Sequence, residues 1–91
     1  MILSLKEIQE KIRKLQGWNL ESNSITKTFE FKDFKLALYF VNKVGELAEK
    51  HGHHPLIVFD YNAVKLSLTT HSEKGLTEKD FVLAEEIDKI E

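Results

Sequence analysis

The sequence predicts a single α+β domain in the element order α-β-β-α-β-β-α, with a four-stranded antiparallel sheet and three helices packed on one face. Apolar residues recur at helical spacing in three separate segments. Between these segments lie two pairs of strand-like runs, and a short polar turn joins each pair. A chain of 91 residues suits one hydrophobic core, so we expect one domain over residues 1–91.

The beginning of the chain predicts a helix and a hairpin. Ser4 and Glu7 form a capping-box signature. Apolar residues then recur at helical spacing before Gly17, where the helix is expected to end: Leu5, Ile8, Ile12 and Leu15. The alternating segment SITKTFEF (residues 24–31) reads as a half-buried strand, and WNLES (residues 18–22) supplies its antiparallel partner.

The middle of the chain predicts a long second helix. Asp33 can cap its start, and we expect it to run to about Lys50. Its apolar residues cover more than half of its circumference: Phe34, Leu36, Ala37, Leu38, Phe40, Val41, Val44, Gly45, Leu47 and Ala48. A face this wide must be covered by the sheet and again by another helix or a second subunit, so we expect a homodimer or homotetramer.

The second hairpin is predicted from LIVFDY (residues 56–61) and VKLSLTTH, which follows it. Asn62 and Ala63 fit a two-residue turn between these strands, although Ala is not the usual second residue. In this register Phe59 lies opposite Leu66. The hairpin would complete a sheet of two antiparallel pairs.

A third helix is predicted at the end of the chain. Thr77 and Asp80 form a second capping signature before EKDFVLAEEIDKI. Four apolar residues of this segment are expected to face the core: Phe81, Ala84, Ile87 and Ile90. Asp80 projects toward the same apolar side, where a carboxylate that serves only as a cap is less expected.

Three of the four histidines lie in HGHHP, residues 51–55, and the fourth is His71. The predicted hairpin register places His54 opposite His71, so the two segments should meet at one end of the sheet. Pro55 cannot donate to a strand ladder and often begins a strand, so the pairing is expected to weaken toward His54.

These histidines have three interpretations. His51 and His53 form an H-x-H pair of the kind that binds zinc or copper, but Gly52 and Pro55 make the segment a turn, and this signature is weak. His51 is well explained by the dipole at the end of the second helix. Imidazole titrates near neutral pH, so neighbouring histidines can donate and accept protons in a proton-transfer or dehydration step without a metal.

Composition excludes several classes of protein. The net charge is −2 and no basic face is evident, so we expect no direct binding to nucleic acid. The chain has no cysteine and therefore no disulfide or thiolate site. No apolar run approaches the roughly 18 residues that cross a bilayer, and no signal peptide is evident, so we expect no membrane association and a cytoplasmic location.

The sequence resembles the pterin-4a-carbinolamine dehydratase family over roughly residues 17–90. The resemblance rests on three segments: FEFKDFKLALYFVNKVGELAEKHGHHP, YNAVKLSLTTH and GLTEKD. It implies a cytoplasmic hydro-lyase that removes water from 4a-hydroxytetrahydropterin to give quinonoid dihydropterin during tetrahydrobiopterin recycling. The substrate would be a pterin, with no metal and no cofactor.

The resemblance also implies three active-site histidines, His53, His54 and His71. Expelling hydroxide from C4a requires a proton on the departing oxygen, while a base removes a proton from a ring nitrogen. We assign His53 and His71 to these two transfers, in either order. We assign His54 to holding the substrate.

Three further residues are expected to support the site. Asp80 matches a family carboxylate that could orient a histidine or bind the pterin, and its alternative role is to cap the third helix. Glu49 matches the acid of an A-E-K segment, and its alternative is a solvated helix residue. Pro55 completes the H-H-P motif. Ile57 stands where the family often has Trp, which puts the fit of the substrate in question.

Two other functions stay open at this point. A family member is known as a dimerisation partner of a homeodomain transcription factor, so the resemblance allows a non-enzymatic binding module of the coactivator type. It also allows an enzyme that acts on another pterin, such as a molybdopterin intermediate. The sequence alone does not separate these functions.

Overall fold

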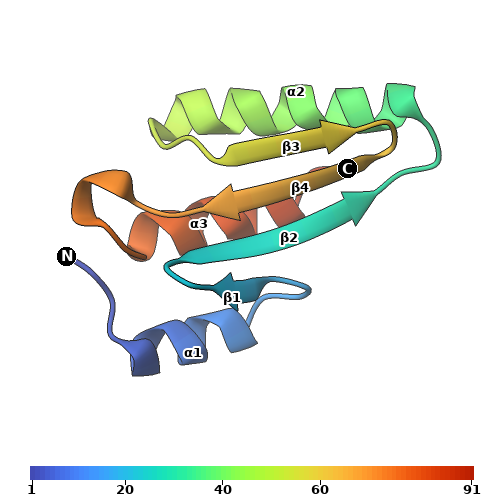
Figure 1. Cartoon of the computed structure of the whole chain (residues 1–91). Helices are drawn as coiled ribbons and strands as arrows, with labels where there is room; N and C mark the ends of the chain where they lie inside the picture. The colour runs from blue at the N-terminus through green and yellow to red at the C-terminus, as the bar shows by residue number, and fades with distance from the viewer.

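The structure, a computed structural model of residues 1–91, has the predicted order of elements (Figure 1). Its elements are α1 (Leu5–Arg13), β1 (Asn19–Glu21), β2 (Ser24–Glu30), α2 (Phe34–His51), β3 (Leu56–Asp60), β4 (Ala63–Leu68), the 3-10 turn η1 (His71–Glu73) and α3 (Glu78–Asp88). The four strands form one antiparallel sheet in the order β1-β2-β4-β3. The predicted α+β class and the predicted set of helices and strands are confirmed.

Local sequence signals start the helices where they were expected. Ser4 and Glu7 form the capping box of α1, and the hydrogen bonds from Ser4 hold the pKa of Glu7 below its ordinary value. Asp33 caps α2. Thr77 and Asp80 form the capping box of α3. Each cap satisfies backbone N–H groups that a helix leaves unpaired at its start.

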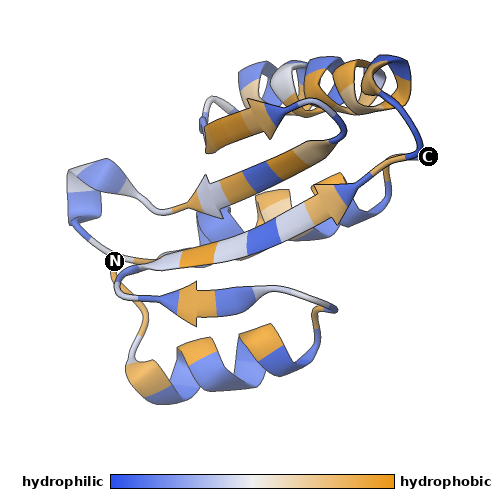
Figure 2. Ribbon diagram, turned by 45° about the vertical axis from the view of Figure 1, so that its right-hand side comes forward, coloured by the Kyte–Doolittle hydropathy of each residue, from blue (hydrophilic) through white to orange (hydrophobic).

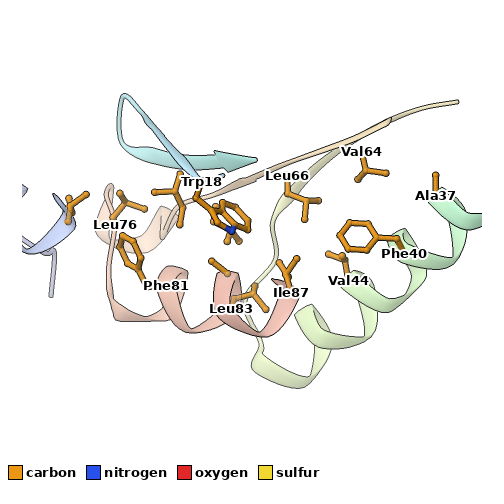
Figure 3. Close-up of a cluster of buried hydrophobic side chains, with 14 residues drawn as sticks. Trp18, Ala37, Phe40, Val44, Val64, Leu66, Leu76, Phe81, Leu83 and Ile87 are labelled. Atoms are coloured by element: carbon orange, nitrogen blue, oxygen red, sulfur yellow. The ribbon is translucent and has the colours of Figure 1, made fainter. Parts of the chain in front are cut away.

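The core lies between the sheet and the helices (Figure 3). The central strand β4 buries every second side chain, because alternate residues of a strand face opposite sides of a sheet. Val64, Leu66 and Leu68 are its fully buried residues, and Val44 of α2 and Phe81 of α3 belong to the same cluster. None of the helices has the length and apolar character that crossing a bilayer demands.

The second hairpin corrects the predicted register. The turn was predicted at Asn62 and Ala63, but Tyr61 and Asn62 form it in the structure, one residue earlier. Phe59 therefore pairs with Val64 instead of Leu66. The partner shifts by two residues, and an even shift leaves each side chain on its original face of the sheet.

A contact from outside the hairpin explains this turn. The Asn62 side-chain amide donates to the backbone carbonyl of Phe31 at 2.8 Å, and the backbone carbonyl of Asn62 accepts from the Phe31 N–H at 2.9 Å. Tyr61 then adopts a φ of 51°, which its bulky side chain does not favour locally. The predicted pairing of His54 with His71 is wrong, since His71 lies beyond β4 in η1.

Trp18 ties the first hairpin to the end of α3. Its indole N–H donates to the carboxylate of Asp88 at 3.0 and 3.2 Å, and Lys27 Nζ lies 2.9 Å from the same group. We expect Asp88→Ala to lower the free energy of unfolding in urea by about 1–3 kcal/mol, because the part-buried indole loses its acceptor. Glu86→Ala removes only an exposed pair with Lys89 and should cost less than about 1 kcal/mol. Equal losses in both variants would contradict this role of Trp18.

Candidate active site

Three segments that are distant in the sequence meet at one end of the sheet. Figure 1 shows the connection from α2 to β3, the turn η1 and the start of α3 at this same end. Gly52 ends α2 in the left-handed conformation, with a φ of 60°, and turns the chain toward β3. His53, His54 and Pro55 follow directly, before the strand begins at Leu56.

His53 is paired with a buried carboxylate. Its Nε2 lies 2.6 Å from Oδ1 of Asp80, whose side chain is fully buried, while the His53 side chain is 11% exposed. The second oxygen of Asp80 accepts from the Thr70 hydroxyl at 2.8 Å and from the Thr77 N–H at 2.9 Å. Both roles considered for Asp80 are therefore present, because one carboxylate closes the cap of α3 and contacts a histidine.

His54 has a carboxylate partner of a different kind. Its Nε2 lies 2.6 Å from Oε2 of Glu49, but the side chains are 62% and 80% exposed. Exposed pairs are weak because water and salt screen them. Glu49 is thus a solvated helix residue, which was the alternative considered for it, and it also contacts His54. The His53 pair is the more buried of the two.

His71 reaches this end of the sheet through a short turn. It begins η1, and the bridge between Thr70 and Gly75 closes the loop that holds η1. The backbone of Thr70 accepts from and donates to Gly75 in this bridge. His71 is exposed at the start of the loop, whereas Thr70 beside it is buried.

The three predicted histidines line one open cleft of about 260 Å³. Its lining residues are Gly52, His53, His54, Thr69, Thr70, His71, Ser72 and Lys79. A second hollow of about 180 Å³ adjoins His53 and is lined by His51, His53, Glu78, Lys79 and Val82. The histidine cluster predicted from the sequence is thus present, although the predicted strand pairing does not form it. His51 lies at the end of α2, outside the main cleft.

Several residues of the cleft were not expected from the sequence, among them Thr70 and Lys79. Thr70 continues the buried alternation of β4, and this periodicity was a signal that could have identified it. Lys79, in the first turn of α3, carried no such signal. Ile57, where the family often has Trp, lies opposite Leu66 on the core face of β3 and lines neither cleft.

The cleft has the groups that proton transfer requires. It combines a histidine backed by a buried carboxylate with two histidines that are open to solvent. Imidazole changes its protonation state near neutral pH, so one ring can accept a proton while another donates one. No three imidazole, carboxylate or thiol side chains are close enough together to bind a metal ion.

Known proteins are similar to this chain over its whole length. The family model described as "Pterin 4 alpha carbinolamine dehydratase" matches residues 1–90. A relative from Sulfolobus acidocaldarius is 45% identical over 91 residues, which is all of both chains. A relative from a Nostoc species is 52% identical over 89 residues, covering 98% of this chain and 96% of the relative. Both carry the provisional name pterin-4-alpha-carbinolamine dehydratase.

Two solved structures share the fold. A protein from Brucella melitensis, described as a transcriptional coactivator/pterin dehydratase, has a TM-score of 0.93 and 39% identity, covering 97% of this chain and 96% of that one. A pterin dehydratase-like protein described as a RuBisCO assembly factor in the alpha-carboxysome has a TM-score of 0.65 and 22% identity. That second likeness covers 78% of this chain and 82% of the other, and it concerns the fold alone.

Proposed function

The chain belongs to the pterin-4a-carbinolamine dehydratase family, and on this premise we propose that it removes water from 4a-hydroxytetrahydropterin to give quinonoid dihydropterin. The observation that carries the proposal is the single cleft lined by His53, His54 and His71, with Asp80 buried behind His53. We further propose that the reaction serves tetrahydrobiopterin recycling in the cytoplasm, as the family resemblance implies.

The chemistry divides between two histidines. His53 is the base: it takes the proton from the ring nitrogen, and the buried carboxylate of Asp80 stabilises the imidazolium that forms. His71 is the acid: its exposed ring has no carboxylate partner and gives its proton to the departing hydroxyl oxygen at C4a. The bond from C4a to oxygen breaks, water leaves, and the ring electrons form the quinonoid product.

The remaining groups hold the substrate. His54 and Lys79 line the same cleft and offer polar contacts to the pterin ring. Glu49 orients His54 through an exposed contact, so its contribution is smaller than that of Asp80. Pro55 fixes the chain between His54 and the first residue of β3.

A pH profile of the wild-type protein tests this division of labour. Catalysis requires His53 to be neutral and His71 to be protonated, so kcat/KM measured from about pH 5 to 9 should rise and then fall as the pH increases. The measurement is the initial rate of dehydration, followed by absorbance in buffers of constant ionic strength. A rate that stays constant across this range would contradict the use of two histidines.

A second candidate function is a binding module that acts through self-association or a protein partner. The observation that favours it is that α2 leaves Leu36, Leu38 and Tyr39 exposed. In Figure 2 the ribbon of α2 carries several orange, hydrophobic segments. The Brucella melitensis protein is described as a coactivator as well as a dehydratase. His71 lies outside this surface, so His71→Ala should abolish dehydration without changing the oligomeric state measured by sedimentation.

A further inference from the structure

We propose that Thr70 is a positioning residue: its hydroxyl donates to Asp80 and so orients and moderates the carboxylate that holds the proton of neutral His53 on Nε2, which leaves Nδ1 to exchange protons with the substrate. The inference deepens the proposed function and rests on it for the identity of the reaction. It concerns the direction of a chain of hydrogen bonds, and the resulting protonation of His53 can be measured in the free protein.

The direction of the chain follows from counting protons. Thr70 Oγ1 lies 2.8 Å from Oδ2 of Asp80 and 2.8 Å from Oγ1 of Thr77. An ionised carboxylate only accepts, and a hydroxyl has one proton to donate. The Thr70 proton therefore points to Asp80, and the Thr77 hydroxyl must donate to Thr70. Thr77 Oγ1 in turn accepts from the Lys79 N–H at 3.3 Å.

This arrangement fixes the orientation of the Asp80 carboxylate. Oδ2 receives two donors, the Thr70 hydroxyl and the Thr77 N–H, which leaves Oδ1 directed at His53. Because Oδ1 can only accept, His53 must carry a proton on Nε2. The contact is 2.6 Å long, as expected for a strong hydrogen bond to a charged group. A neutral His53 is consequently the Nε2–H tautomer.

The other nitrogen of His53 is the one available for chemistry. Nδ1 has no hydrogen-bond partner in the protein, and it is not among buried polar atoms that lack one, so it is not completely buried. His53 lines the cleft that also contains His54 and His71. A neutral Nε2–H imidazole has its lone pair on Nδ1, which is the state that a general base requires.

The hydrogen bond from the Thr70 hydroxyl is buried, and the side chain can be replaced by one of similar shape that lacks the hydroxyl. Thr70, Thr77 and Asp80 are 5%, 6% and 0% exposed. In such surroundings a hydrogen bond to a charge is stronger than in water. Valine has nearly the same shape as threonine, so Thr70→Val removes the donor to Asp80, and with it the acceptor of the Thr77 hydroxyl, with little change in packing. Thr70→Ser keeps the donor.

Other ionisable groups also face His53. The clefts on its two sides contain His51, His54, His71, Glu78 and Lys79. None of their side chains is hydrogen-bonded to Thr70. Thr70→Val therefore leaves the direct contacts of these groups unchanged, and an altered titration of His53 reports on Asp80.

The first test uses ¹⁵N NMR of the histidine rings in the free protein. Wild type and Thr70→Ser should show neutral His53 as the Nε2–H tautomer. In Thr70→Val the carboxylate loses a donor and becomes a stronger acceptor, so the imidazolium is favoured and the titration midpoint of His53 should rise. Thr26→Val, which removes a buried hydroxyl on β2 outside the site, should leave the midpoint at its wild-type value. A His53 midpoint that is the same or lower in Thr70→Val would overturn the proposal.

The second test uses dehydration kinetics. Thr70→Val should lower kcat about tenfold with KM within about twofold, and should move the acidic limb of the pH profile to higher pH. Thr70→Ser should restore both quantities. A Thr70→Val enzyme with wild-type kcat and pH profile would overturn the positioning role. If wild type does not catalyse dehydration, the proposed function fails, and the NMR test still decides the tautomer of His53.

Discussion

Asp80→Asn is expected to lower kcat for dehydration by about 10²–10⁴-fold while the protein stays folded. The asparagine oxygen can accept from the Thr70 hydroxyl and the Thr77 N–H, as Oδ2 of Asp80 does now. The amide NH₂ then faces His53 and donates to Nε2, which forces the ring proton onto Nδ1. The variant therefore loses both the free base and the negative charge that stabilises imidazolium.

Glu49→Gln is the matched control for this change. It makes the same carboxylate-to-amide substitution at the other histidine pair, where the side chains are largely exposed. We expect kcat to fall less than tenfold there, since an exposed pair contributes about 1 kcal/mol or less. Steady-state kinetics and urea unfolding of both variants provide the comparison. An Asp80→Asn enzyme as active as Glu49→Gln would contradict the special role of the buried carboxylate.

His53→Gln is expected to lower kcat by a similar factor, about 10²–10⁴, because the base itself is removed. Glutamine has an NH₂ group that can still donate to Asp80, so the buried carboxylate keeps a partner and the fold should persist. His53→Ala leaves that carboxylate without a third donor, and it should be less stable as well as inactive.

His51→Gln is the matched control for the histidine substitution. His51 is exposed at the end of α2 and lies outside the main cleft, so its replacement should change kcat less than about twofold. Single-turnover measurements with freshly generated substrate separate the chemical step from product release. The account fails if His53→Gln retains the rate of His51→Gln.

The elements of the fold could be predicted because their signals are local. Ser4, Asp33 and Thr77 mark the three helix starts in the sequence, and all three act as caps in the structure. Alternation likewise identified β2, and two strand-like runs identified β3 and β4. The order of strands in the sheet could not be predicted in this way, because the pairing of β2 with β4 depends on contacts between distant segments.

The register of the second hairpin could not be predicted for the same reason. A turn at Asn62 and Ala63 fits the local sequence, but the hydrogen bonds between Asn62 and Phe31 favour a turn at Tyr61 and Asn62. These bonds to Phe31, the residue after β2, outweigh the cost of a positive φ at Tyr61.

The predicted meeting of the three histidines is observed, although the strand pairing from which it was argued is wrong. His53, His54 and His71 do line one cleft, but His71 reaches it through η1 and not through strand pairing with His54. The Asp80 contact with His53 depends on packing between α3 and the segment before β3, which no spacing in the sequence specifies. Thr70 completes that contact and was found only in the structure.

The most direct test of the account is the dehydration of freshly generated 4a-hydroxytetrahydropterin by the purified protein, followed by absorbance beside the uncatalysed reaction. We expect wild type to accelerate the loss of water well above background, and His71→Ala to lose that acceleration while it stays folded, because the acid for the leaving oxygen is gone. Folded wild-type protein that gives only the background rate would contradict the proposed activity.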